Sequence, residues 1–194
     1  MFDYLIKNGK IIDGTKKNGF VADIAIIGDS IVEIGEINTP SNVEINAKGK
    51  IVCPGFIDLH THSDASFLID PYADSKLTQG VTLELVGNCG MSFCAPLIGG
   101  AKKRFEEWIK QSGENLIPNW KDFDGYLEML EKTGSTINLA TQVGHGTVRS
   151  AVMDMDPRMP TQAPTGSIRG SLLLTAILAR SPGSRAAPRI SIRP

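Results

Sequence analysis

Histidine, cysteine and long apolar runs are scarce in this 194-residue sequence. The three cysteines have no Cys-x-x-Cys spacing, which argues against a disulfide framework and leaves core thiols or a metal ligand. The longest apolar run, LLLTAILA, is far shorter than the roughly 20 residues that span a bilayer, and the chain does not start with a signal-peptide pattern. A net charge of -1 provides no field that would attract nucleic acid or an anionic membrane surface. We therefore expect a cytoplasmic protein with no nucleic-acid partner and no membrane partner.

Two kinds of pattern follow one another along the chain, and 41% of the residues are hydrophobic, enough for a sizeable core. Residues 3–53 have the alternation of short strands, with Gly28-Asp29 as a hairpin turn, and predict a small antiparallel sheet. From Pro54 onward, the apolar segments GFIDLH, VTLELVG and INLATQVG alternate with helical patterns. This alternation is typical of a parallel α/β sheet.

The segment WKDFDGYLEMLEK has the clearest helical pattern. Asn119 is its expected N-cap, and Gly134 is the expected left-handed residue just past its end. A helix over this segment places five apolar side chains on one face: Trp120, Phe123, Tyr126, Leu127 and Leu130.

The composition changes after Pro160. All 21 acidic residues and all 12 lysines lie at or before Met159, whereas residues 161–194 contain five arginines and no acidic residue or lysine. No repeat or functional low-complexity motif accounts for this bias, but a change of reading frame would. We therefore predict a division into residues 1–53, residues 54–160 and a non-native tail, residues 161–194.

Two of the three histidines, His60 and His62, stand one residue apart in PGFIDLHTHSD. On a strand their imidazoles project from the same face, roughly 6.6 Å apart, which is close enough to bind one cation. Asp58 or Asp64 could orient a ring by accepting its free N–H. Hydrogen-bonded core histidines are the alternative, and the polar THSD at the end of the run favours a metal site.

Cys89 and His145 follow the next two apolar segments. Cys89 lies in GNCG, where glycines let the backbone bring a thiolate to an ion, and zinc accepts mixed histidine and cysteine ligands. Arg149, four residues after His145, is a candidate for binding a substrate carboxylate. The alternatives are a buried thiol for Cys89, a structural hydrogen bond for His145 and a surface ion pair for Arg149. Because parallel strands of a (β/α)8 barrel end on one face, we expect these segments to meet there.

Three segments resemble the amidohydrolase superfamily and, within it, the D-aminoacylase group of N-acyl-D-amino-acid deacylases. They are PGFIDLHTHSD, QGVTLELVGNCGMSFCAPL and WKDFDGYLEMLEKTGSTINLATQVGHGTVRSAVM. The first is typical of the whole superfamily, whereas GNCG together with VGHGTVR is much more specific to the deacylases. The resemblance runs from about residue 3 to about residue 161.

The resemblance implies a metal-dependent-hydrolase (β/α)8 barrel, here about three βα units, preceded by part of a small β-sandwich. It implies that His60, His62 and Cys89 bind Zn2+, and it matches His145 to a Gly-His segment of the family. The implied reaction is zinc-dependent hydrolysis of the amide bond of an N-acyl-D-amino acid to a D-amino acid and a carboxylate. That small-molecule substrate is the implied partner, and the oligomeric state is left open.

The general-base aspartate and further metal-binding histidines of the family lie on later barrel strands. No histidine or acidic residue occurs after residue 160, and a full barrel takes about 250 residues. We therefore expect this truncated chain to lack deacylase turnover. Two alternatives stay open: another amidohydrolase, such as a dihydroorotase-like or hydantoinase-like cyclic amidase, and a non-catalytic metal-binding fragment.

Overall fold

The computed structural model describes residues 1–93, 95–159, 177–179 and 190–193. The chain divides into two compact units. The first unit comprises Met1–Phe56, Thr78–Thr82 and Gly183–Pro194, and the second comprises Ile57–Leu77 and Leu83–Pro182. The predicted non-native tail lies outside the described residues except for two short strands. Among the helices of the described part, none is long and apolar enough to cross a membrane.

The first unit is a six-stranded sheet in the order β10-β5-β1-β2-β3, with β4 also paired to β1. Antiparallel pairing joins β1 to β2 and β2 to β3, whereas β4 and β5 both run parallel to β1. The strands are β1 Phe2–Ile11, β2 Phe20–Ile27, β3 Ser30–Gly35, β4 Ser41–Asn46, β5 Ile51–Pro54 and β10 Ile190–Arg193.

The sheet is therefore mixed, and the prediction of an antiparallel sheet is wrong for β4 and β5. These two strands pair one after the other with the same edge of β1. Lys48 and Gly49, which lie between them, interrupt the pairing without reversing the chain into a hairpin. The chain stays attached through this interruption, because Ala47 N donates to Lys7 O (2.8 Å) and Lys10 N donates to Lys50 O (3.0 Å). Local turn residues cannot reveal this, since parallel pairing depends on where the chain crosses over.

The hairpin predicted at Gly28-Asp29 is confirmed. Ile27 pairs with Ser30 across a two-residue loop, and Gly28 has a φ of 59°. A first loop residue in the left-handed region favours glycine, which lacks the Cβ that would clash. Apolar side chains of this unit are buried in two clusters. The larger comprises Ile6, Ile11, Ile24, Ile26, Ala47 and Val52, and the smaller comprises Leu5, Ala25 and Ile37.

Most of a four-stranded sheet in the order β6-β7-β8-β9 lies in the second unit; the first residues of β6 and β7 are counted with the first unit. Strands β7 and β8 are parallel. The backbone bonds from Phe56 N to Gly80 O (2.8 Å) and from Thr61 N to Leu85 O (3.1 Å) advance equally along both segments, so β6 runs the same way as β7. The strands are β6 Phe56–Asp58, β7 Val81–Val86, β8 Asn138–Thr141 and β9 Ile177–Ala179. The predicted alternation of parallel strands and helices is confirmed for β6, β7 and β8.

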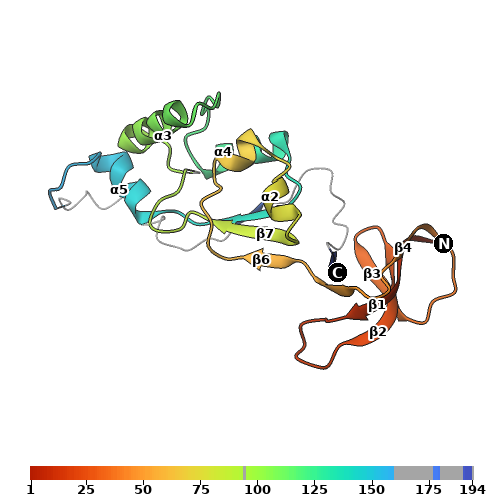
Figure 1. Cartoon of the computed structure of the whole chain (residues 1–194). Helices are drawn as coiled ribbons and strands as arrows, with labels where there is room; N and C mark the ends of the chain where they lie inside the picture. The colour runs from red at the N-terminus through yellow and green to blue at the C-terminus, as the bar shows by residue number, and fades with distance from the viewer. Residues whose placement is uncertain (94, 160–176, 180–189, 194) are drawn as a thin grey trace. The chain divides into compact units, whose positions relative to one another are not determined.

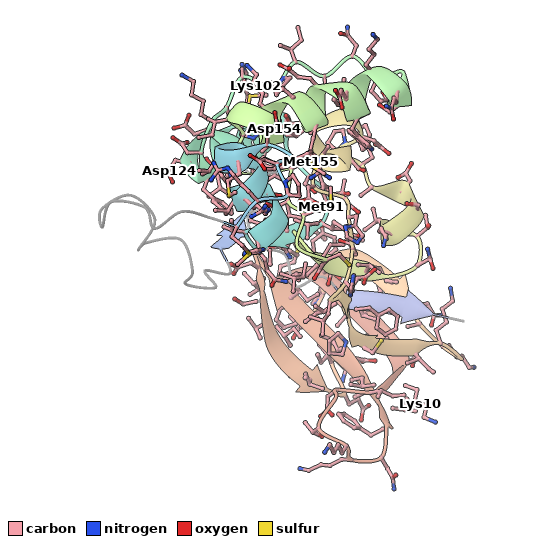
Figure 2. All side chains as sticks on the ribbon, turned by 90° about the vertical axis from the view of Figure 1, so that its left-hand side faces the viewer. Lys10, Met91, Lys102, Asp124, Asp154 and Met155 are labelled. Atoms are coloured by element: carbon pink, nitrogen blue, oxygen red, sulfur yellow. The ribbon has the colours of Figure 1, made fainter. Side chains whose placement is uncertain are left out.

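The described residues of this unit form five helices, and α2, α3 and α4 lie on the same side of β6 and β7 in Figure 1. Figure 2 shows Asp154, at the end of α5, beside the α3 ribbon that carries Lys102. The two helices approach closely because Gly100 has no Cβ, which would otherwise lie 2.6 Å from Ser150 O. The helices are α1 Ser66–Ile69, α2 Asp74–Leu77, α3 Gly99–Ser112, α4 Phe123–Thr133 and α5 His145–Met153.

Helix α4 begins later than its sequence pattern predicts, so the expectation of Asn119 as N-cap is wrong. Asp122 is the N-cap, and its side chain accepts a hydrogen bond from Gly125 N (3.0 Å). Trp120 precedes the helix, yet it is buried because its ring packs against Phe105 on α3. The predicted end at Gly134 is confirmed with a φ of 80°, although a ψ of 164° lies outside the left-handed helical region.

Candidate metal centre

His60 and His62 lie just beyond β6, which ends at Asp58. Their ring centroids are 5.7 Å apart and the ring planes are inclined by 63°. Thr61, between them, is bound to β7 because its N–H donates to Leu85 O (3.1 Å). The segment therefore keeps its pairing with β7 past the end of the strand, and this pairing leaves both imidazoles free to face one ligand.

Cys89 lies three residues beyond the end of β7, in the turn Gly87-Asn88-Cys89-Gly90. Its φ of 54° is in the left-handed region, which costs a residue with a Cβ of order 1 kcal/mol or more. Gly87 and Gly90 also have positive φ, 80° and 74°, so the turn bends sharply. It brings Cys89 Sγ to 3.1 Å from His60 Nε2.

The sequence-predicted ligands are brought together. One donor atom from each of His60, His62 and Cys89 lies within 4.8 Å of the others, and all three side chains are exposed. Zinc binds imidazole nitrogen at about 2.0 to 2.1 Å and thiolate sulfur at about 2.3 Å, so tetrahedral ligands are roughly 3.3 to 3.6 Å apart. The observed separations, 3.1 Å between His60 Nε2 and Cys89 Sγ and at most 4.8 Å within the group, lie on either side of this range, and two nitrogens with one sulfur suit a zinc ion.

A charge network joins the strands below these ligands. Lys76 Nζ lies 2.8 Å from Asp58 Oδ2 on β6 and 2.9 Å from Glu84 Oε1 on β7. Glu84 is fully buried, and the two carboxylates raise the pKa of Lys76. The hydrogen bond from Lys76, followed by that from the His60 N–H, lowers the pKa of Asp58. The only hint of this network in the sequence is a charged residue inside the apolar run VTLELV.

The two aspartates that were candidates for orienting an imidazole make other contacts. Asp58 Oδ1 accepts from the backbone N–H of His60 (3.3 Å), so it holds the histidine segment through its main chain. Asp64 Oδ2 accepts from Phe93 N (3.1 Å), and Asp64 is 2% exposed. Burial raises the pKa of Asp64, against the lowering effect of its backbone hydrogen bonds and of His62.

The turn that carries Cys89 is docked onto Gly144 and the first turn of α5. Gly90 O accepts from Gly146 N (2.7 Å), and Gly144 N donates to Ser92 Oγ (3.0 Å). Thr147 Oγ1 accepts from Ser92 N (2.7 Å). A Cβ on Gly144 would lie 2.6 Å from the backbone of Gly90, so the two glycine turns fit together backbone to backbone. The paired glycines of GNCG and GHG are the sequence signal for this contact, which sequence reasoning missed.

His145 and Arg149 are placed differently from the metal ligands. His145 is the first residue of α5 and does not end a strand, and among the described residues it is not in the group of donor atoms formed by His60, His62 and Cys89. Arg149 Nη2 donates to the backbone oxygens of Asp156 (2.6 Å) and Arg158 (2.8 Å). Arg149 thus holds the segment after α5, and substrate binding by either residue stays a prediction.

The model of the amidohydrolase family matches residues 43–185 of the chain. The chain belongs to the amidohydrolase family. An amidohydrolase relative, the D-aminoacylase of Alcaligenes xylosoxydans xylosoxydans, is 35% identical over 169 residues, which cover 87% of this chain and 34% of the relative. The chain thus spans about a third of the length of this relative.

Two solved amidohydrolases have the same fold over the shared part. A D-aminoacylase studied for the role of its binuclear metal centre has 35% identity and a TM-score of 0.64, covering 79% of this chain and 32% of that one. The N-acyl-D-glutamate deacylase of Bordetella bronchiseptica, complexed with zinc and a phosphonate that mimics the tetrahedral intermediate, has 36% identity and a TM-score of 0.69. It covers 83% of this chain and 33% of that one. This match supports the predicted amidohydrolase fold over part of its length.

Proposed function

We propose that this chain supplies the first part of the active site of a zinc-dependent N-acyl-D-amino-acid deacylase. The reaction is hydrolysis of the amide bond to give a D-amino acid and a carboxylate. The observation that carries the proposal is the meeting of His60, His62 and Cys89, whose donor atoms lie within 4.8 Å of one another. The D-aminoacylase and deacylase relatives support the substrate class.

In this proposal the residues of the chain have distinct tasks. His60, His62 and Cys89 hold zinc, which when bound polarises an amide carbonyl and activates water for attack. Asp58 and Lys76 keep the histidine segment in place through the His60 backbone and β7. His145 and Arg149 are candidates for binding the substrate, and none of the 194 residues is assigned as the general base.

Metal content tests the proposal directly. We expect the purified 194-residue chain to bind one zinc ion, measured by elemental analysis after dialysis. Cys89→Ala is expected to lose most of this zinc, and Cys53→Ala is the matched control because Cys53 lies on β5 in the first unit. Absence of zinc in the parent chain would contradict the proposal, and full retention in Cys89→Ala would favour an amidohydrolase centre that needs no cysteine.

Turnover is a separate measurement. We expect the zinc-loaded chain to leave N-acetyl-D-amino acids intact, since none of its residues is assigned as the general base. Hydrolysis that depends on zinc and on His60 would show instead that the residues of this chain suffice for the reaction.

A further inference from the structure

Asn88, which precedes Cys89, connects the ends of three parallel strands, β6, β7 and β8. Its Nδ2 donates to Leu85 O (2.8 Å) in β7 and to Thr61 O (3.2 Å) beyond β6. Its Oδ1 accepts from Gln142 Nε2 (3.3 Å), on the residue that follows β8. A single half-buried carboxamide therefore has one contact at each of the three strand ends.

These contacts lie next to the candidate ligands in the sequence. Thr61 stands between His60 and His62, so its carbonyl belongs to the backbone that sets both imidazoles. Asn88 is bonded through its own main chain to Cys89. We propose that Asn88 is a positioning residue that sets the separation between the histidine pair and the cysteine, an inference that rests on the metal centre of the proposed function.

The chemistry of the side chain explains why a carboxamide is needed here. Two donors must point at two carbonyl oxygens while an oxygen accepts from Gln142, and only Asn and Gln carry both groups on one planar unit. An aspartate keeps the acceptor and loses both donors. It would also place a negative charge beside the carbonyl oxygens of Leu85 and Thr61, so both hydrogen bonds to these oxygens would be lost and replaced by repulsion.

The fold does not depend on this carboxamide alone. Thr61 is attached to β7 by two further bonds, from its N–H (3.1 Å) and its Oγ1 (3.2 Å) to Leu85 O. The pairing of the histidine segment with β7 thus remains when Asn88 is changed. The effect should therefore appear in the geometry of the metal ligands more than in unfolding.

Cobalt binding to the 194-residue chain tests the inference, because a cobalt thiolate has a charge-transfer band that reports Cys89 in the ligand set. We expect Asn88→Ala and Asn88→Asp to weaken cobalt affinity by about 10- to 100-fold, as for other residues that orient metal ligands, and to shift or weaken the band. The midpoint of thermal unfolding of the metal-free chain should change little. Asn46→Asp is the control, because Asn46 accepts hydrogen bonds in the first unit and aspartate preserves this role.

The outcomes separate the two proposals. If the parent chain binds no cobalt, the metal centre and this inference both fail. If the parent binds cobalt and both Asn88 variants bind it with the same affinity and band, only the positioning role is wrong. If the Asn88 variants do not fold, Gln142→Ala removes the third contact of the same carboxamide, and an unchanged affinity and band in that variant would overturn the inference.

Discussion

Both units bury apolar side chains, but they differ in how many polar side chains they bury. Of the eight buried polar or charged residues in the described part of the chain, Asp23 lies in the first unit and the other seven in the second. Asp23 caps two backbone N–H groups, of Asn8 (2.8 Å) and Ile37 (3.2 Å), within an otherwise aliphatic core. The seven are Thr61, Asp64, Glu84, Ser92, Thr141, Thr147 and Ser150.

Burying a polar group is costly unless it is hydrogen-bonded, so this concentration has a physical meaning. Several of the seven hold the loops around the candidate ligands, as Ser92 and Thr147 do between the two glycine turns. The first unit is stabilised by apolar contacts between strands. The second unit also buries polar groups, and the hydrogen bonds that several of them form hold the loops around the candidate ligands in place.

Both tryptophans lie in the second unit, so fluorescence distinguishes the units. Trp108 and Trp120 each pack within an aromatic cluster centred on Phe105. Tryptophan emission therefore follows the unfolding of the second unit, whereas circular dichroism follows both. Each of the variants below is expected to act on one unit.

Lys76→Met is expected to have the largest effect. It leaves the buried Glu84 carboxylate without its cation, and breaking a buried ion pair costs about 3 to 5 kcal/mol, with the low end expected because Lys76 is partly exposed. Urea unfolding followed by tryptophan fluorescence measures the loss. The double variant Lys76→Met with Glu84→Leu should recover much of it, because no buried charge remains.

This contribution also has a predictable pH dependence. The pKa of Lys76 is raised, so the folded chain holds this proton more tightly than the unfolded chain. The stabilisation is complete below the ordinary lysine value of 10.5 and is lost as the pH rises through the higher folded value. The difference between the parent and the double variant, which has no buried Glu84 carboxylate, should therefore stay constant near neutral pH, and a steady decline between pH 6 and 8 would contradict the assignment.

Gly144→Ala is expected to have the second-largest effect on the stability of the second unit. The new Cβ would meet the Gly90 backbone at 2.6 Å, and overpacking of this kind costs about 1 to 3 kcal/mol. Because Gly90 adjoins Cys89, zinc affinity should fall together with stability. Gly35→Ala is the control, since a Cβ there meets no atom within 4 Å. Equal effects of the two variants would mean that the glycine turns are not in close contact.

Asp122→Ala tests the observed start of α4. Loss of an N-cap side chain costs about 1 kcal/mol, and tryptophan fluorescence should report it because α4 packs beside Trp120. Asn119→Ala, which removes the cap that the sequence pattern favours, should leave the unfolding free energy unchanged. If Asn119→Ala lowered the unfolding free energy and Asp122→Ala did not, the helix would begin at Trp120, as the sequence pattern predicts.

Ile24→Val is the mildest change and concerns the first unit. Removing one buried methylene costs about 0.5 to 1.5 kcal/mol, since Ile24 lies in the main apolar cluster. Circular dichroism should detect the loss while the tryptophan transition stays unchanged. A shift of the tryptophan transition by the same amount would show that the two units unfold together.

Local patterns in the sequence were enough to find strands β1 to β8, the Gly28-Asp29 hairpin, the end of α4 and the three donors of the candidate metal centre, but they did not predict β9 and β10. These features depend on residues within a few positions of one another, where periodicity and glycine placement are informative. Asn119 failed as a cap because Trp120 joins a distant aromatic cluster, and burial overrides local preference.

The sequence by itself determined which chemical groups stand at the strand ends: two imidazoles, a thiol and glycines that allow sharp turns. Only the tertiary structure decided the parallel pairing of β4 and β5 with β1, the bridge of Lys76 between two strands and the contacts of Asn88 with Thr61 and Gln142. The physical reason is that such contacts join segments far apart in the chain. Their partners are set by how the whole sheet packs, and no local pattern of residues encodes that choice.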